Sequence, residues 1–259
     1  MPRFFIELCY QGTAYHGFQV QENANTVQAE LSKALTIFYR ENFELTGSSR
    51  TDAGVHALQN YFHVDTTIDI NDKHIYNINA LLPPDIAVRS IREVGATAHC
   101  RFDAVARSYS YHIYREKDPF MRDRAWFYPY PLDISLMQEA AEMIKEYRDF
   151  TSFSKRNTQV YTFNCDIIES RWEEFEGESY KVEGIRNRTR EHMGVLVYHV
   201  KANRFLRGMV RGLVATMVKL GRKQIDLSEF RHIIEAKDCT KADFSSPPHG
   251  LCLEWVWFL

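Results

Sequence analysis

Apolar and polar residues alternate with a period of two in several segments of the chain, a pattern typical of β-strands. The clearest case is residues 105–116, VARSYSYHIYRE, in which odd-numbered side chains share one face and even-numbered side chains the other. The same pattern, together with runs of apolar and β-branched residues, predicts further strands at 3–12, 57–67, 87–94, 161–170, 194–202 and 251–259.

Helical spacing separates these strands. In residues 25–41, five apolar side chains lie on one helical face, and Asn25 with Gln28 has the spacing of a capping box. The segment 71–86 is predicted to contain a helix that Pro83 and Pro84 stop. Further helices are predicted at 133–147, about 205–219 and 226–236. Strands that helices interrupt irregularly favour an α+β class with a large, mostly antiparallel sheet.

Composition narrows the possible functions. The 259 residues carry a net charge of -2, which argues against a protein that coats nucleic acid without sequence preference. The chain shows no leader and no apolar run long enough to span a bilayer, so we expect a cytoplasmic protein with no membrane partner. Its five scattered cysteines predict reduced thiols, and no His, Cys and carboxylate set has metal-ligand spacing. We therefore expect no metal and no cofactor.

Several enzyme classes lose support because their motifs are missing. The sequence has no phosphate-binding P-loop, no glycine-rich dinucleotide motif after the first strand and no G-x-S-x-G nucleophile elbow. A basic block stands out instead, because residues 201–223 contain seven Lys and Arg and no acidic residue. On the helix predicted at 205–219, Arg204, Arg207, Arg211 and Lys219 fall on one narrow stripe. That stripe fits close approach of phosphate, or an Arg that reaches a buried carboxylate.

The segment SSRTDAGVHA, residues 48–57, combines turn-forming residues with a single carboxylate, Asp52. Asp52 could simply close a turn and pair with Arg50, and on physical grounds this is about as probable as a functional role. A turn at the edge of a sheet is, however, where a scaffold presents catalytic groups, and Arg50 could keep the carboxylate ionised. On the strand at 105–116, Arg107 and Tyr109 share a face, so Tyr109 offers a ring on which a base could stack, whereas half-buried aromatic packing explains Tyr111.

The segment SSRTDAGVHA is similar to the signature of the TruA-type tRNA pseudouridine synthases. Five further segments, in the same order as in that family, extend the resemblance over almost the whole chain: YQGTAYHGFQVQ, AHCRFDAVARSYSYHIY, RDFTSFSK, NRFLRGMVRGLV and PPHGLCLEWV. The resemblance implies a pseudouridine synthase fold, in which two related α/β halves share an extended, mostly antiparallel sheet with flanking helices and a central basic cleft. The halves are expected at 1–103, with the catalytic loop, and at 104–259.

The resemblance also implies an activity: isomerisation of uridine to pseudouridine at positions 38 to 40 of the tRNA anticodon stem-loop, by a homodimer without cofactor or metal. It assigns Asp52 as the catalytic aspartate, Tyr109 as the stacking tyrosine, Arg50 and Arg211 as active-site arginines, and Leu251 as a packing residue. We expect Arg107, Arg204 and Arg207 to contact the tRNA. The Asp52 carboxylate would attack C1′ of the ribose, attack C6 of the uracil or take the proton from C2′ of the ribose. The sequence leaves all three routes open.

Two departures from the family pattern stand out. Ser49 replaces a usual Gly, which is tolerated if its φ is negative. Residues 171–193 are longer than the family's common turn, and we expect a decorated surface loop rather than a hairpin whose Arg186, Arg188 and Arg190 touch RNA. Two other functions stay open as alternatives: a non-catalytic RNA-binding module and a nucleic-acid glycosylase or nuclease. A glycosylase also uses one Asp but needs an activated water, and a two-metal nuclease needs a carboxylate cluster that the sequence does not show.

Overall fold

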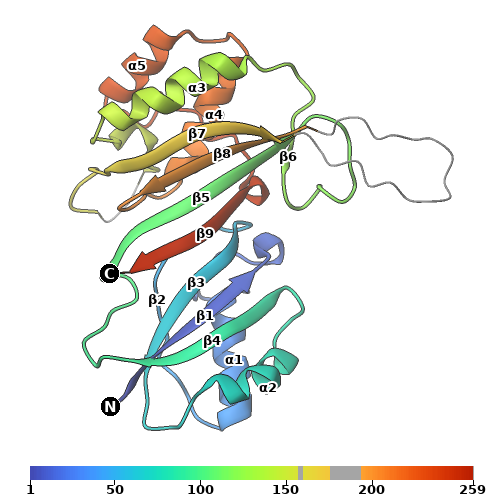
Figure 1. The fold of residues 1–259 in the computed structure, drawn as a ribbon, viewed down its shortest axis with the longest axis vertical. Coiled ribbons are helices and arrows are strands. Elements are labelled where there is room, and N and C mark those ends of the chain that lie inside the picture. The colour runs from blue at the N-terminus through green and yellow to red at the C-terminus, as the bar shows by residue number, and fades with distance from the viewer. Residues whose placement is uncertain (157–159, 176–193, 259) are drawn as a thin grey trace, which may run out of the picture. The chain divides into compact units, whose positions relative to one another are not determined.

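A computed structural model describes residues 1–156, 160–175 and 194–258. The chain forms two compact units, of which the first contains Met1–Tyr109 and Cys252–Leu259 and the second contains Ser110–Leu251. Helices and strands occur in both units (Figure 1), and most of the strand pairs are antiparallel. The predicted α+β class is therefore confirmed.

The sheet of the first unit has the strand order β4-β1-β3-β9. Its strands are β1 (Arg3–Tyr10), β3 (His56–Asp65), β4 (Ile86–Val94) and β9 (Leu251–Phe258), and the short β2 (Thr46–Gly47) pairs with β3. β1 is antiparallel to both β3 and β4, whereas β9 is parallel to β3, with His56 opposite Cys252. The last strand of the chain therefore belongs to the N-terminal unit, beside the strand that follows the Asp52 loop.

Two helices, α1 (Val27–Tyr39) and α2 (Ile75–Leu81), belong to the same unit. The predicted apolar face of α1 is buried in the core at Val27, Leu31, Ala34 and Leu35. The cap differs from the prediction, because the Oγ1 atom of Thr26, not the side chain of Asn25, accepts from the amide of Ala29. Both residue types suit an N-cap, so spacing alone could not place the helix start to one residue.

Among its described residues, the second unit contains the sheet order β5-β8-β7 and three α-helices. Its strands are β5 (Ala104–Tyr114, from Ser110 onward), β7 (Ile167–Phe175), β8 (Val195–Ala202) and the short β6 (Trp126–Phe127), which pairs parallel with β5. The helices are α3 (Ile134–Met143), α4 (Met209–Gly221) and α5 (Leu227–Glu235). The capping box predicted for α5 is present between Asp226 and Glu229.

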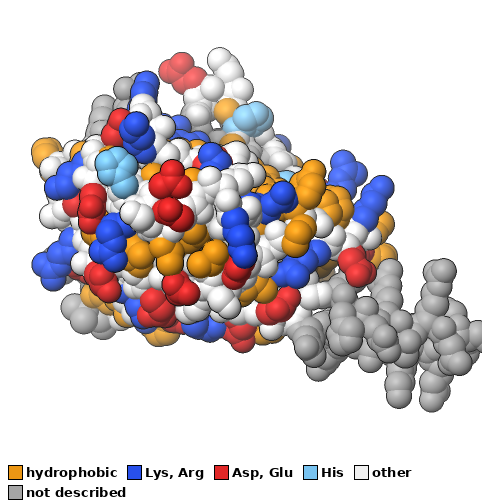
Figure 2. Space-filling model, turned by 90° about the horizontal axis from the view of Figure 1, so that it is seen from above, with side chains coloured by type: hydrophobic (Ala, Val, Ile, Leu, Met, Phe, Trp, Pro, Cys, Tyr) orange, Lys and Arg blue, Asp and Glu red, His pale blue; other side chains and the backbone are white. Residues whose placement is uncertain are grey.

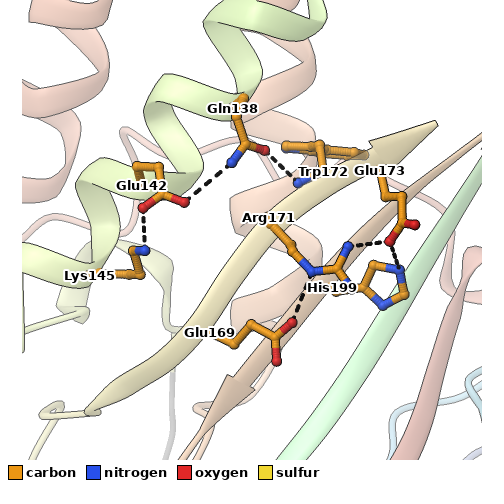
Figure 3. Close-up of polar contacts among 8 residues, drawn as sticks. All are labelled: Gln138, Glu142, Lys145, Glu169, Arg171, Trp172, Glu173 and His199. Atoms are coloured by element: carbon orange, nitrogen blue, oxygen red, sulfur yellow. Dashed lines mark hydrogen bonds and ion pairs between the residues drawn. The ribbon is translucent and has the colours of Figure 1, made fainter.

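Helix α3 is fixed to the edge strand β7 by one side chain (Figure 3). The Oε1 atom of Gln138 accepts from the backbone amide of Trp172 at 2.8 Å, so a helix side chain satisfies a donor of the edge strand. Farther along β7, Arg171 bridges Glu169 and Glu173. These charged side chains lie at the sheet edge, where they disfavour pairing with another chain.

Two predicted elements are wrong in their bounds. The helix expected from about residue 205 begins at Met209, because Gly208 adopts a left-handed φ of 74° that an α-helix does not contain. The strand expected at 161–170 is shifted to Ile167–Phe175, where it pairs with β8 as far as Phe175 opposite Val195. The predicted loop at 171–193 therefore begins as a strand, and its Arg186, Arg188 and Arg190 lie outside the described residues.

Figure 2 shows the molecule from above, on the side of α3 and α5. Positive and negative side chains are mixed on this face. Lys and Arg side chains alternate there with Asp and Glu among the described residues. Ion pairs such as Lys223 with Asp133 and Lys237 with Asp149 account for part of this mixing. No helix in the described part of the chain is both long and apolar enough to cross a membrane.

Candidate active site

Asp52 lies in a turn whose backbone is fixed from several sides. The carbonyl of Asp52 accepts from the amide of Val55 at 3.2 Å, and Gly54 between them has a φ of 79°, in the left-handed region that glycine adopts without strain. The amide of Gly54 donates to the carbonyl of Tyr15, and the carbonyl of Thr51 accepts from the amide of Phe18. Asp52 is half-buried, so the turn presents its carboxylate from a rigid support.

A close approach beneath this turn explains Gly12. A Cβ atom added to Gly12 would lie 2.0 Å from the carbonyl oxygen of Val55, which is backbone and cannot rotate away. The amide of Gly12 also donates to Nδ1 of His56 at 3.0 Å, at the start of β3. The chain after β1 therefore packs directly against the end of the Asp52 turn.

Arg50 does not hold the carboxylate as the sequence suggested. Its side chain is exposed, and within the described residues it forms no ion pair with Asp52. Ser49, in contrast, meets the condition that its φ is not positive. It is absent from the described non-glycine residues with positive φ. Ser49 is buried, and its Oγ atom has no hydrogen-bond partner.

Tyr109 and Arg107 belong to the first unit, as Asp52 does. Tyr109 is half-buried against the core, and this burial raises the pKa of its phenol. The positive charge of Arg107 opposes that shift, whereas the negative charge of Asp52 adds to it. The guanidinium of Arg107 also donates to the carbonyls of Ala104 and Arg101 at 2.8 and 2.7 Å, which fixes the turn before β5. Asp52, Arg107 and Tyr109 therefore belong to one unit, and Tyr109 is influenced electrostatically by the other two.

The other predicted residues belong to the second unit. Arg211, in the first turn of α4, donates from Nε and Nη2 to the carbonyl of Ser246 at 2.8 and 2.6 Å, and the Ser246 hydroxyl donates back to the carbonyl of Arg211. Tyr111, which is fully buried, donates to the carbonyl of Pro247 at 2.8 Å. Arg211 and Tyr111 therefore fix the segment that leads to Leu251, which is itself buried.

The basic stripe predicted for α4 is not a single helix face. Arg204 and Arg207 precede the helix, Ala215 is buried, and Lys219 pairs with Asp243 at 3.0 Å. Arg207 is exposed and Arg204 half-buried. Arg204 and Arg207 thus lie outside the helix for which the stripe was predicted, and Lys219 has an acidic partner within its own unit.

Only one group of His, Cys and acidic side chains in the described residues has its ligand atoms close enough together for a metal ion: His63, His99 and Cys100, within 4.8 Å of one another. Nδ1 of His99 accepts from the amides of Arg101 and Phe102, so the proton of the neutral ring is on Nε2 and neither nitrogen is available as a ligand. Burial raises the pKa of the Cys100 thiol to about 12, and its sulfur donates to the carbonyl of Thr46. We therefore assign this cluster to core hydrogen bonding.

His63 makes the stability of the protein sensitive to acid. Burial lowers the pKa of His63 to about 4, with smaller contributions from Arg3 and His99, while Asp65 and Asp103 oppose the shift. Between pH 6.5 and 4 the unfolded chain binds a proton at this position that the folded protein does not, so stability present above pH 6.5 is lost as the pH falls. We expect urea unfolding to show a loss of about 2–3 kcal/mol from this residue between pH 7 and pH 4.

The matched variants are His63→Gln and His16→Gln, since His16 is exposed in the same unit. His63→Gln is expected to flatten the acid side of the stability profile, whereas His16→Gln keeps the slope of the unchanged protein. An identical slope in all three proteins would contradict the assignment to His63.

The sequence did not identify three buried residues behind the Asp52 turn: Tyr10, Asn60 and, within the motif, Thr51. The hydroxyls of Tyr10 and Thr51 lie 2.7 Å apart, and Asn60 donates to the Tyr10 hydroxyl. The available signal was Asn60, an amide in the middle of the largely apolar strand ALQNYFHV. An amide inside a buried strand needs partners for all its polar atoms.

Comparisons with known proteins identify the family of the chain. A family model described as tRNA pseudouridine synthase matches residues 9–103 and 143–258. The chain is 42% identical over 258 residues to a protein of Bacteroides thetaiotaomicron named tRNA pseudouridine synthase A, covering 98% of this chain and 89% of that protein. Proteins of the same name in Porphyromonas gingivalis and Staphylococcus aureus are 40% and 34% identical, covering 99% and 98% of this chain and 97% and 90% of their own lengths.

Proposed function

Because the chain belongs to the tRNA pseudouridine synthase family, we propose that Asp52 is the residue with which it isomerises uridine at positions 38 to 40 of the tRNA anticodon stem-loop. The protein is an isomerase that acts on tRNA. The observation that supports Asp52 most is its setting, in which a half-buried carboxylate in a rigid turn influences the phenol of Tyr109.

The reaction needs few groups, because pseudouridine is an isomer of uridine and no group is added or removed. The C1′–N1 bond breaks, the uracil turns, C1′ bonds to C5, the C5 proton leaves and N1 gains a proton. Asp52 begins this sequence as a nucleophile at C1′ or C6, or as the base that takes the C2′ proton. Each route requires an ionised carboxylate aimed at the nucleoside, and the turn from Asp52 to Val55 supplies the fixed direction.

Tyr109 would hold the uracil while it turns. Its raised pKa keeps the phenol neutral at physiological pH, and a neutral ring beside Asp52 suits stacking on a flipped base. Arg107, whose guanidinium is fixed by two backbone carbonyls, adds a positive charge on the same side.

Residues of the second unit would contribute support and RNA contacts. Arg211 keeps Ser246 in place, and with it the segment that leads to Leu251, the proposed packing residue. Arg204 and Arg207 would bind phosphates, which offsets part of the few kcal/mol that flipping a base out of a stem costs. Arg50, exposed at the edge of the turn, is better placed for RNA than for pairing with Asp52. We further propose a cytoplasmic homodimer.

Modification mapping tests the position of the reaction. An unmodified tRNA with uridine at 38, 39 and 40, and three versions that each carry cytidine at one of these positions, are incubated with the protein and sequenced for pseudouridine. We expect each replacement to remove pseudouridine at that position alone. Pseudouridine outside the anticodon stem-loop would overturn the proposed position, and free uracil would show a glycosylase instead.

A further inference from the structure

A buried set of hydrogen bonds joins the sheet of the first unit to the Asp52 turn. Tyr10 ends β1, and Asn60 lies on the neighbouring strand β3. The Tyr10 hydroxyl lies 2.7 Å from Oγ1 of Thr51, and Nδ2 of Asn60 donates to the same hydroxyl at 3.2 Å. Tyr10, Thr51 and Asn60 are 5%, 7% and 0% exposed, so no water competes for these bonds.

Asn60 also satisfies the backbone of Ser49 in both directions. Its Nδ2 donates to the carbonyl of Ser49 at 2.8 Å, and its Oδ1 accepts from the amide of Ser49 at 3.3 Å and from the amide of Tyr61 at 2.9 Å. The Asn60 side chain therefore bonds to both backbone polar groups of Ser49, as a neighbouring β-strand would. Because both polar ends of the amide are occupied, its orientation is fixed.

The two sets of bonds hold the chain at residues 49 and 51, immediately before Asp52. Residue 49 is held through its backbone by Asn60, and residue 51 is held through its side chain by Tyr10. The carbonyl of Thr51 is also used, because it accepts from the amide of Phe18. The amide and carbonyl of Ser49 and the hydroxyl of Thr51 are therefore all bonded to residues of the sheet. These three bonds determine the direction in which Asp52 leaves the turn.

Tyr10 connects this support to the base-holding side of the site as well. Its ring stacks on Phe18 at 5.8 Å between centroids, and its phenol is close enough to Tyr109 for the two to interact electrostatically. The Tyr10 side chain therefore bonds to the support of Asp52 and interacts electrostatically with Tyr109.

We propose that Tyr10 and Asn60 are positioning residues, which set the aim of Asp52 through Thr51 and Ser49. The inference rests on the proposed role of Asp52. A misplacement of a reacting group by about 1 Å costs on the order of 100-fold in rate, so loss of a single hydroxyl behind the turn is sufficient to affect the chemistry. Neither residue needs to touch the substrate.

The test compares Tyr10→Phe with Tyr61→Phe. Both variants remove a hydroxyl from a buried tyrosine of the same sheet, but the Tyr61 hydroxyl donates to Glu7 and has no contact with the Asp52 turn. We expect Tyr10→Phe to lower kcat for pseudouridine formation about 10- to 100-fold, with KM changed less than about 3-fold. Tyr61→Phe is expected to keep kcat within about 2-fold, with a comparable change in Tm.

A second pair of variants separates positioning from packing. Thr51→Val removes the hydroxyl that faces Tyr10 and keeps the volume, whereas Thr51→Ser keeps the hydroxyl and loses a methyl group. We expect kcat to fall in Thr51→Val and to recover most of that loss in Thr51→Ser. An unchanged kcat in Tyr10→Phe, or equal losses in Tyr10→Phe and Tyr61→Phe, would overturn the inference.

The two proposals fail in different ways. If Asp52→Asn keeps full activity, the proposed role of Asp52 fails, and the positioning role fails with it. If Asp52→Asn is inactive while Tyr10→Phe and Thr51→Val are fully active, Asp52 stands and only the positioning role is overturned.

Discussion

Asp52→Asn is expected to lower kcat for pseudouridine formation by at least about 10⁴-fold, because an amide neither attacks carbon nor takes a proton as a carboxylate does. The amide has nearly the same shape, so the turn from Thr51 to Val55 and the tRNA affinity should change little. Single-turnover nucleoside analysis measures the rate, and a filter-binding titration measures the affinity.

Asp69→Asn is the matched control for this prediction. Asp69 is an exposed acid of the same unit, and its side chain accepts a hydrogen bond from Asn71, which an amide oxygen can also accept. Wild-type rates are expected in this variant. A rate within about 10-fold of wild type in Asp52→Asn would remove Asp52 from the chemistry.

Tyr109→Ala is expected to lower kcat/KM about 10- to 100-fold, because stacking of a base on an aromatic ring contributes about 1–3 kcal/mol. If the ring also retains the uracil during its rotation, the variant should release some free uracil in place of pseudouridine. Nucleoside and nucleobase analysis of the same reaction measures both products.

Tyr109→Phe is the control, because it keeps the ring that packs against the core and loses only the hydroxyl. Unfolding curves for both variants show how much of any loss reflects stability, since Tyr109→Ala also removes core contacts. Full activity in Tyr109→Ala would exclude stacking, and a loss in Tyr109→Phe as large as that in Tyr109→Ala would assign the effect to the hydroxyl.

Much of the fold follows from local sequence patterns. The apolar face of α1, the capping box of α5 and the strand β5 each depend on residues a few positions apart, so they could be predicted. The start of α4 could not, because it depends on whether Gly208 takes the left-handed conformation. Local patterns also could not predict that β9 pairs with β3 in the first unit, since the two strands are almost 200 residues apart.

The candidate site divides in the same way. Asp52 and Tyr109 could be proposed from their motifs, and the structure places both in the first unit. The ion pair expected between Arg50 and Asp52 is not formed, because spacing of two residues does not fix where an exposed side chain points. The support from Tyr10 and Asn60 was missed, since Tyr10 meets Thr51 only when β1 and the turn are folded together.

Tritium release from tRNA labelled at C5 of uridine tests the central claim most directly, because formation of the C1′–C5 bond expels the C5 hydrogen. With the unchanged protein we expect one tritium released for each pseudouridine formed, and no free uracil. With Asp52→Asn we expect neither tritium release nor pseudouridine. Stoichiometric release in the absence of the Asp52 carboxylate, or free uracil with the unchanged protein, would contradict the claim that Asp52 starts an isomerisation.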